Sequence, residues 1–172
     1  SVNGSPNPEK RMFGAQQMEW LKDALRTSQQ DKHINFRIIA TGSQVLNERS
    51  PWDRLKNFPA EYEELMRFLD HERISGVVFL TGDRHNSQVM KQERKGNYTL
   101  YDVTCSPLTS GLAKLAKEEV NDPARIFLHE TSNNYGKISF SGPKENRKLT
   151  VEFKDTKGSV AGKWSVYASE LR

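Results

Sequence analysis

The feature that most constrains the fold of this chain is an uninterrupted apolar run that stops at a glycine. Val77–Thr81 shows no alternation of apolar and polar residues, so a strand formed here must be covered on both faces. Such strands are typical of the interior of a parallel sheet. Gly82, Asp83, Arg84 and His85 follow directly. The sequence therefore predicts an interior strand with chemically active side chains at its carboxyl end.

These side chains stand where α/β proteins bind ligands, just outside the carboxyl ends of the strands. Asp83 and His85 are two residues apart, so in an extended chain both point into one crevice. Both residue types bind zinc and transition metals. The alternative is a structural turn, in which Asp83 caps the backbone and His85 is exposed.

Length and composition agree with one globular domain. The chain has 172 residues, of which 28% are charged and 35% hydrophobic, which is enough for a core and unlike a disordered chain. We expect an amino-terminal loop over residues 1–12 and a single domain over residues 13–172. No apolar run approaches the roughly 20 residues that cross a bilayer. Cys105 is the only cysteine, which excludes an internal disulfide and a cysteine-based metal cluster.

Periodicity predicts the elements around the interior strand. A helix is expected from Gly14, a strand over residues 36–41 and a second helix over residues 59–69. The two strands and the second helix then form one right-handed crossover, which brings Gly42 beside Gly82. The long connection over residues 43–58 would hang over the carboxyl end of the interior strand.

The rest of the chain adds further elements. A strand is expected over residues 98–104 and a helix over residues 108–120, where apolar residues recur at helical spacing. Alternating apolar and polar residues then predict antiparallel strands at the end of the sheet, over residues 135–141, 148–154 and 163–168.

Several short segments, in this order, carry a resemblance to a known family. They are GAQQMEWL at residues 14–21, residues 38–45, Trp52-Asp53, FPAE at residues 58–61, TGDRH at residues 81–85, VTCSPLTS at residues 103–110 and NYG at residues 134–136. Their order and spacing resemble the carboxyl-terminal half of a PhoD-like alkaline phosphatase, a branch of the calcineurin-like metallophosphoesterases. The resemblance runs from about residue 13 to the end of the chain.

The resemblance implies a four-layer α-β-β-α fold, with helices outside two packed sheets and a metal centre between the sheet edges. It implies hydrolysis of phosphate mono- or diesters with divalent or trivalent metal ions such as calcium, iron, zinc or manganese. It also implies an extracellular or periplasmic location, although residues 1–10 show no signal pattern.

The same resemblance assigns residues to roles. Asp83 and His85 match the last metal-binding motif of the superfamily, as an acidic variant of His-x-His, and would each hold one metal ion. Arg84 is the candidate catalytic residue and would hold a phosphate oxygen; a solvated cation at the strand end is the alternative. Trp52 and Asp53 are candidate substrate-binding residues at the mouth of the site, or anchors of their loop.

The superfamily's earlier metal-binding motifs have no counterpart here. Asp83 and His85 alone leave each ion with one protein ligand, far fewer than the four or so that metals require. We therefore expect an incomplete phosphatase, inactive alone, whose partner is the missing amino-terminal half of the domain and whose substrate is a phosphate ester.

Two other classes of protein remain as alternatives. One is a non-catalytic α/β interaction module in which the Gly-Asp-Arg-His turn is structural. The other is a nucleic-acid binder, which the net charge of +4 and the pI of about 9.2 suggest. Lysine and arginine are spread along the chain and not clustered with aromatic residues, which disfavours nucleic-acid binding.

Overall fold

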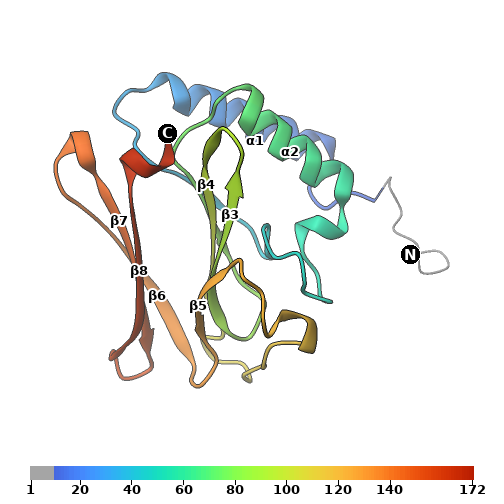
Figure 1. Ribbon diagram of the computed structural model, residues 1–172, viewed down its shortest axis with the longest axis vertical. Coiled ribbons are helices and arrows are strands. Elements are labelled where there is room, and N and C mark those ends of the chain that lie inside the picture. Colours follow the sequence, from blue (N-terminus) through green and yellow to red (C-terminus); the bar gives the residue numbers. More distant parts are fainter. Residues whose placement is uncertain (1–9) are drawn as a thin grey trace.

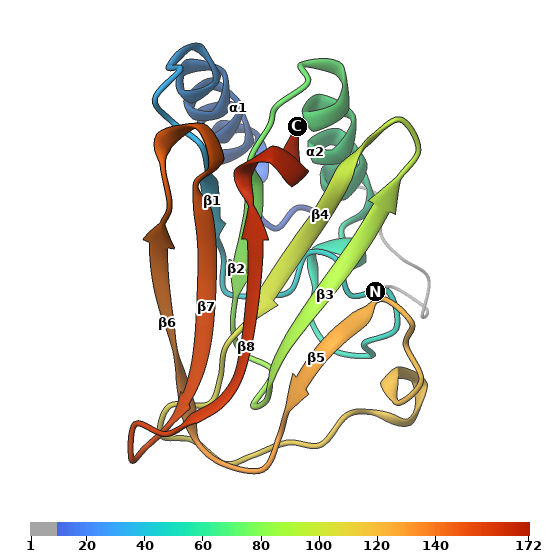
Figure 2. The same ribbon diagram turned by 60° about the vertical axis from the view of Figure 1, so that its left-hand side comes forward.

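Two β-sheets face each other, and two helices cover the outer face of the larger sheet (Figure 1). The structure is a computed structural model that describes residues 10–172. The larger sheet has the strand order β1-β2-β4-β3-β5, and the smaller has the order β6-β7-β8 (Figure 2). The elements are α1 Gly14–Gln30, β1 Arg37–Ala40, α2 Pro59–His71, β2 Val77–Thr81, β3 Ser87–Arg94, β4 Asn97–Thr104, β5 Arg125–His129, β6 Asn134–Ser141, β7 Lys148–Asp155 and β8 Val160–Tyr167, with short 3-10 helices at Leu55–Asn57, Lys117–Glu119, Lys144–Asn146 and Ala168–Leu171.

Strand β2 lies inside the larger sheet, between β1 and β4, and is parallel to both. The helix α2 crosses over between β1 and β2 and begins at Pro59, which suits a first helical position. The predicted interior strand and its strand–helix–strand crossover are therefore confirmed.

The apolar run of β2 is explained by two hydrophobic clusters, one on each face of the sheet. Phe79 packs with the buried face of the two helices, including Leu25 and Leu65. Val78 packs on the other side with residues of the smaller sheet, including Val151. Burial on both faces is what forbids alternation in this strand.

The three carboxyl-terminal strands are antiparallel, as predicted, but they do not extend the larger sheet. They form a separate sheet, because their alternating pattern leaves one apolar face to be buried. That face, with Leu149, Val151 and Phe153 of β7, packs against the larger sheet.

The prediction of a helix over residues 108–120 is wrong. Only Lys117–Glu119 is helical, as one 3-10 turn, and the segment before it is irregular. Leu112 and Val120, which the helical stripe would bury, are 44% and 54% exposed. The strands β3 and β5 were not predicted, since β3 begins with the buried polar residues Ser87 and Gln88.

The fold class is confirmed as α/β with a mixed sheet, because β3 runs antiparallel to β4. Residues 10–172 supply three layers, in the order helices, sheet and sheet (Figure 1). Of the loop expected over residues 1–12, residues 1–9 lie outside the described part. No helix in that described part is long and apolar enough to span a membrane.

Leu65→Ala tests how far stability depends on the packing of α2. Leu65 is fully buried, so its truncation should lower the free energy of unfolding by about 2–5 kcal/mol in denaturant melts. Arg67→Ala, on the exposed face of the same helix, is the control and should change it by about 0.5 kcal/mol or less. A loss below about 1 kcal/mol for Leu65→Ala would mean that α2 is peripheral to the core.

Candidate functional site

The Gly-Asp-Arg-His turn follows β2 directly and takes an unusual backbone shape. The amide of Gly82 donates to the carbonyl oxygen of Gly42 at 3.2 Å, so the predicted neighbourhood of these two glycines is confirmed. Asp83 and His85 have positive φ angles of 65° and 56°. Non-glycine residues in this left-handed region are strained, at a cost of about 1–3 kcal/mol each. The surroundings of the turn must therefore hold it.

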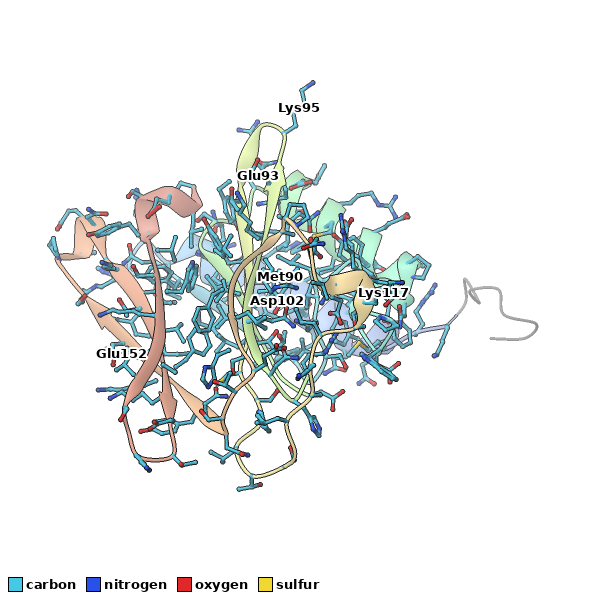
Figure 3. All side chains as sticks on the ribbon, turned by 60° about the horizontal axis from the view of Figure 1, so that its bottom comes forward. Met90, Glu93, Lys95, Asp102, Lys117 and Glu152 are labelled. Carbon is cyan, nitrogen blue, oxygen red and sulfur yellow. The ribbon has the colours of Figure 1, made fainter. Side chains whose placement is uncertain are left out.

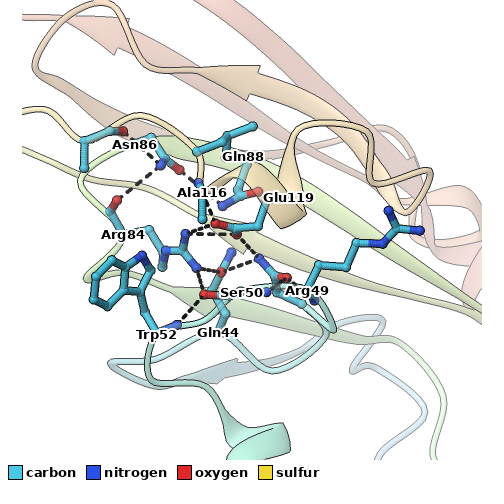
Figure 4. Close-up of polar contacts among 12 residues, drawn as sticks. Gln44, Arg49, Ser50, Trp52, Arg84, Asn86, Gln88, Ala116 and Glu119 are labelled. Carbon is cyan, nitrogen blue, oxygen red and sulfur yellow. Dashed lines mark hydrogen bonds and ion pairs between the residues drawn. The ribbon is translucent and has the colours of Figure 1, made fainter.

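Arg84, between the two strained residues, points into the protein and provides that hold (Figure 4). Its Nη2 donates to both carboxylate oxygens of Glu119, at 2.9 and 2.7 Å. Its Nη1 donates to Oε1 of Gln44 at 3.0 Å and also to Oγ of Ser50. The Arg84 side chain is only 4% exposed, so the alternative of a solvated cation is wrong. A phosphate contact would have to compete with Glu119 for this guanidinium.

The ion pair belongs to a network that ties the connection after β1 to the sheet. Nδ2 of Asn47 donates to Oε1 of Gln44 at 2.9 Å and to Oε1 of Glu119 at 2.8 Å. Nε2 of Gln44 donates to Oγ1 of Thr104, at the end of β4, at 2.7 Å. A buried charge pair is stabilising only when its remaining hydrogen-bonding groups are satisfied, and these amides do so.

Asp102 fixes the start of the same connection from inside β4. Its carboxylate is fully buried, beside Met90 of β3 (Figure 3). It accepts hydrogen bonds from the amides of Val45 and Leu46, at 2.7 and 2.9 Å, and from Oγ1 of Thr81 at 2.6 Å. Burial raises the pKa of Asp102 in spite of these three donors, which lower it.

The pKa of Glu119 is shifted the other way. Burial would raise it, but hydrogen bonds from Arg84 and Asn47 and the charge of Arg84 outweigh burial, and the pKa lies below its ordinary value. Glu119 is therefore held as a carboxylate at neutral pH, which keeps the ion pair intact.

His85 is held in one orientation by the segment between β4 and β5. Its Nδ1 lies 2.7 Å from the carbonyl oxygen of Gly111, and its own carbonyl oxygen accepts from the amide of Ala113 at 2.9 Å. A carbonyl only accepts, so Nδ1 carries a proton, and in the neutral imidazole Nε2 has the free lone pair. Metal-binding histidines commonly have this arrangement.

Asp83 is exposed at the other end of the turn. Within residues 10–172 its carboxylate makes no hydrogen bond and no ion pair, so the backbone cap that the structural-turn interpretation requires is not found there. A carboxylate without partners in this range, two residues from an oriented imidazole in the same turn, is available to bind a ligand.

The loop that carries Trp52 and Asp53 is attached to the turn through Ser50. The hydroxyl oxygen of Ser50 accepts a hydrogen bond from Nη1 of Arg84 and another from the backbone amide of Trp52, the latter at 3.1 Å (Figure 4). The Trp52 side chain is itself 63% exposed, and Asp53 is exposed beside it. Trp52 is thus not buried as an anchor, and contact of these two residues with a substrate stays a prediction.

Residues 10–172 do not form a complete metal site by themselves. Among residues 10–172 no group of three or more His, Cys, Asp or Glu side chains is arranged to hold an ion. Asp83 and His85 have the right donor atoms, but two ligands fall short of the four or so that a metal takes. His129 lies on β5 with its Nε2 2.9 Å from Oγ of Ser132.

With this geometry in hand, comparison with known proteins identifies the family. A family model described as PhoD-like phosphatase matches residues 3–157. The chain belongs to the PhoD-like phosphatase family. The resemblance inferred from the short motifs is thereby confirmed.

Two relatives show how much of a PhoD-like protein is present. Alkaline phosphatase D of Bacillus subtilis (strain 168) is 28% identical over 90 residues, which cover 48% of this chain and 15% of the relative. A solved structure titled "Structure of PhoD" superposes with a TM-score of 0.65 at 18% identity, over 96% of this chain and 36% of that one. The likeness shows a shared fold. The chain spans well under half the length of these PhoD-like proteins.

Sequence reasoning missed the residues that position the PhoD-like turn. Glu119 and Gly111 lie in the segment expected to be helical. In such a helix Glu119 would be a surface residue and Gly111 would belong to the first turn. Asp102 did offer a signal, because a carboxylate within the apolar pattern of β4 must find partners when it is buried.

Glu119→Ala should strongly destabilise the chain, because it leaves the guanidinium of Arg84 buried without its counter-charge. We expect a loss of about 3–5 kcal/mol in the free energy of unfolding, measured in denaturant. The control is Glu118→Ala, the neighbouring exposed glutamate, with an effect of about 0.5 kcal/mol or less. Equal effects of the two substitutions would contradict a stabilising role for the ion pair.

Glu119→Gln tests the charge itself through its pH dependence. Because the pKa of Glu119 in the folded state lies below the ordinary 4.5, its carboxylate stabilises fully above about pH 4.5 and loses this effect as the pH falls through the lower folded-state value. The difference in unfolding free energy between the natural chain and Glu119→Gln should be largest near neutral pH and shrink in acid. Asp102 is present in both proteins, so its contribution cancels in the difference. A difference in unfolding free energy that stays constant with pH would contradict a stabilising role for the charge of Glu119.

Proposed function

We propose that this chain supplies part of the metal centre of a phosphoester hydrolase, with Asp83 and His85 as two of the ligands. The observation that carries the proposal is the orientation of His85. Gly111 holds its Nδ1, so Nε2 is free on the same turn as the unpartnered carboxylate of Asp83. Two donors of this kind on a held turn are what a metal site requires of one segment.

The other ligands would come from a part of a longer protein that this chain does not include. The chain covers only 36% of the PhoD structure that it matches, which leaves room for such a part. The isolated chain should then bind metal weakly and lack activity. A histidine nitrogen with a carboxylate suits zinc, iron or manganese better than calcium, which prefers oxygen ligands alone.

When bound, such a metal ion polarises a phosphoryl oxygen and lowers the pKa of water that attacks phosphorus. The residues of this chain orient the ligands for that chemistry. The carbonyl of Gly111 keeps the proton on Nδ1 of His85. Arg84 acts as a positioning residue, since its pairing with Glu119 holds the strained backbone on either side of it.

The substrate is a phosphate ester that enters beside the loop of Trp52 and Asp53. Attachment of that loop to Arg84 through Ser50 supports this role, because it keeps the two exposed side chains beside the turn. An extracellular or periplasmic location is part of the same proposal.

Asp83→Asn and His85→Ala test the assignment in a full-length protein that contains this segment. Each should lose bound metal after dialysis, measured by elemental analysis, and at least about 100-fold in phosphoesterase activity, because a direct ligand is removed. His71→Ala, which removes an exposed histidine at the end of α2, should leave both unchanged.

A second readout does not depend on activity. In the isolated chain, ring-nitrogen NMR shifts of His85 should report the Nδ1–H form, and zinc should shift its Nε2 signal weakly. Full metal content and full turnover in both ligand variants would show that the turn is structural and would favour a non-catalytic interaction module.

A further inference from the structure

A cavity of about 290 Å³ lies between the two sheets at the edge where β2 and β4 end. We call it the Gly136 pocket. Its walls are mainly apolar and include Leu80, Cys105, Leu108, Gly136 and Ile138. Nothing in the metal-ligand assignment uses these residues.

The pocket adjoins the Gly-Asp-Arg-His turn through the backbone. Thr81, which lines it, is separated from Asp83 only by Gly82, and its carbonyl accepts from the amide of Cys105 at 3.0 Å. Leu108, at the rim, belongs to the same segment as Gly111, whose carbonyl orients His85. Figure 2 shows the chain leaving β2 and β4 at the edge where β6 begins. The pocket and the turn therefore occupy one edge of the sandwich.

Gly136 lines this space without a side chain. It is in the interior of β6 and does not have a positive φ angle, so its backbone does not require glycine. A Cβ atom built there would lie 3.3 Å from Sγ of Cys105 and 3.7 Å from Cγ1 of Val151, inside the pocket wall. Glycine within a strand commonly marks a close approach by a ligand or another chain.

The rim of the pocket is apolar as well as its interior. Leu108 is 64% exposed and Tyr135 is 41% exposed, although both are large side chains next to a polar turn. Grouped exposed apolar residues beside a cavity are a feature of ligand sites. An empty apolar cavity of about 150 Å³ is large enough to bind benzene, so this one can take a substituted ring or a short acyl chain.

We propose that the Gly136 pocket receives the apolar group of the phosphoester whose phosphate lies at the Asp83–His85 turn. This inference rests on the proposed function and adds the substrate class: esters of phenols or other apolar alcohols, in preference to esters of glycerol or sugars. The occupant is inferred from the position of an apolar cavity at the same sheet edge as the turn that is proposed to hold the metal-bound phosphate.

The first experiment uses the isolated chain without metal and is independent of catalysis. Saturation-transfer NMR should detect 1-naphthyl phosphate bound to the chain, and glycerol 3-phosphate should give no signal. Gly136→Val, which fills the pocket, should weaken naphthyl phosphate binding at least tenfold. Lys137→Val is the matched control, since it adds the same side chain at the next, exposed position of β6 and should bind as the natural chain does.

Gly136→Val crowds Cys105 and could therefore disturb folding as well as binding. A thermal melt of each variant separates the two effects, and Leu108→Asp provides a second variant. Leu108 is exposed at the rim, so its substitution should leave the melt unchanged and still weaken naphthyl phosphate binding. The proposal would be overturned if both variants fold and bind naphthyl phosphate as tightly as the natural chain does. It would also be overturned if the natural chain binds glycerol 3-phosphate as tightly as naphthyl phosphate.

The second experiment uses a full-length protein and separates this inference from the proposed function. The ratio of kcat/KM for 1-naphthyl phosphate to kcat/KM for glycerol 3-phosphate should exceed one and fall about tenfold in Leu108→Asp. Phosphoesterase activity without this preference would overturn the pocket assignment and leave the function standing. Binding by the isolated chain but not by the full-length protein would also overturn it, since another segment would then fill the pocket. Pocket-dependent binding with no hydrolysis of either ester would overturn the function and support the ligand class.

Discussion

The arrangement of the site depends on one buried ion pair, between Arg84 and Glu119. Taking two charges out of water is costly, and this pair offsets the cost by satisfying almost every donor and acceptor around it through Gln44, Asn47 and Ser50. The three segments that it joins are the turn after β2, the connection after β1 and the stretch before β5. These segments have no regular structure beyond the short 3-10 helices Leu55–Asn57 and Lys117–Glu119. Their positions relative to each other follow from the charges that meet between them.

The sheets and the ion pair make different contributions to the sheet edge that carries the Gly-Asp-Arg-His turn. Strand β2 is covered on both faces and holds the turn at a fixed position at the edge of the two sheets. The network holds the Arg84 side chain inside the protein, while Asp83 is exposed and His85 is half-buried. The carbonyl of Gly111 adds the last constraint, on the ring of His85. Rigid elements place the backbone, and polar contacts across long sequence distances set the chemistry.

That division also explains which parts could be predicted from the sequence. Val77–Thr81, its crossover and the meeting of Gly42 with Gly82 follow from local patterns and from the handedness of parallel connections. Residues 108–120 have helical spacing, yet contacts with Arg84 and His85 draw this segment into an irregular path, and such tertiary contacts override propensity. The partner of Arg84 lies 35 residues further on, and no local pattern indicates it. The resemblance implied two packed sheets, but the alternating pattern by itself placed the last three strands in the larger sheet, because alternation predicts one buried face and does not say what covers it.

The positive φ angles of Asp83 and His85 have a consequence for how such a site can change over time. Asp83 is exposed, His85 is half-buried, and neither belongs to the two hydrophobic clusters, so other ligand types can replace them with small effects on the core. Glycine at either position would relieve backbone strain at the loss of a ligand, and it would also give the unfolded chain more conformational freedom. The persistence of two strained side chains here would be a sign of use, and the inward-facing arginine between them is the residue least free to vary.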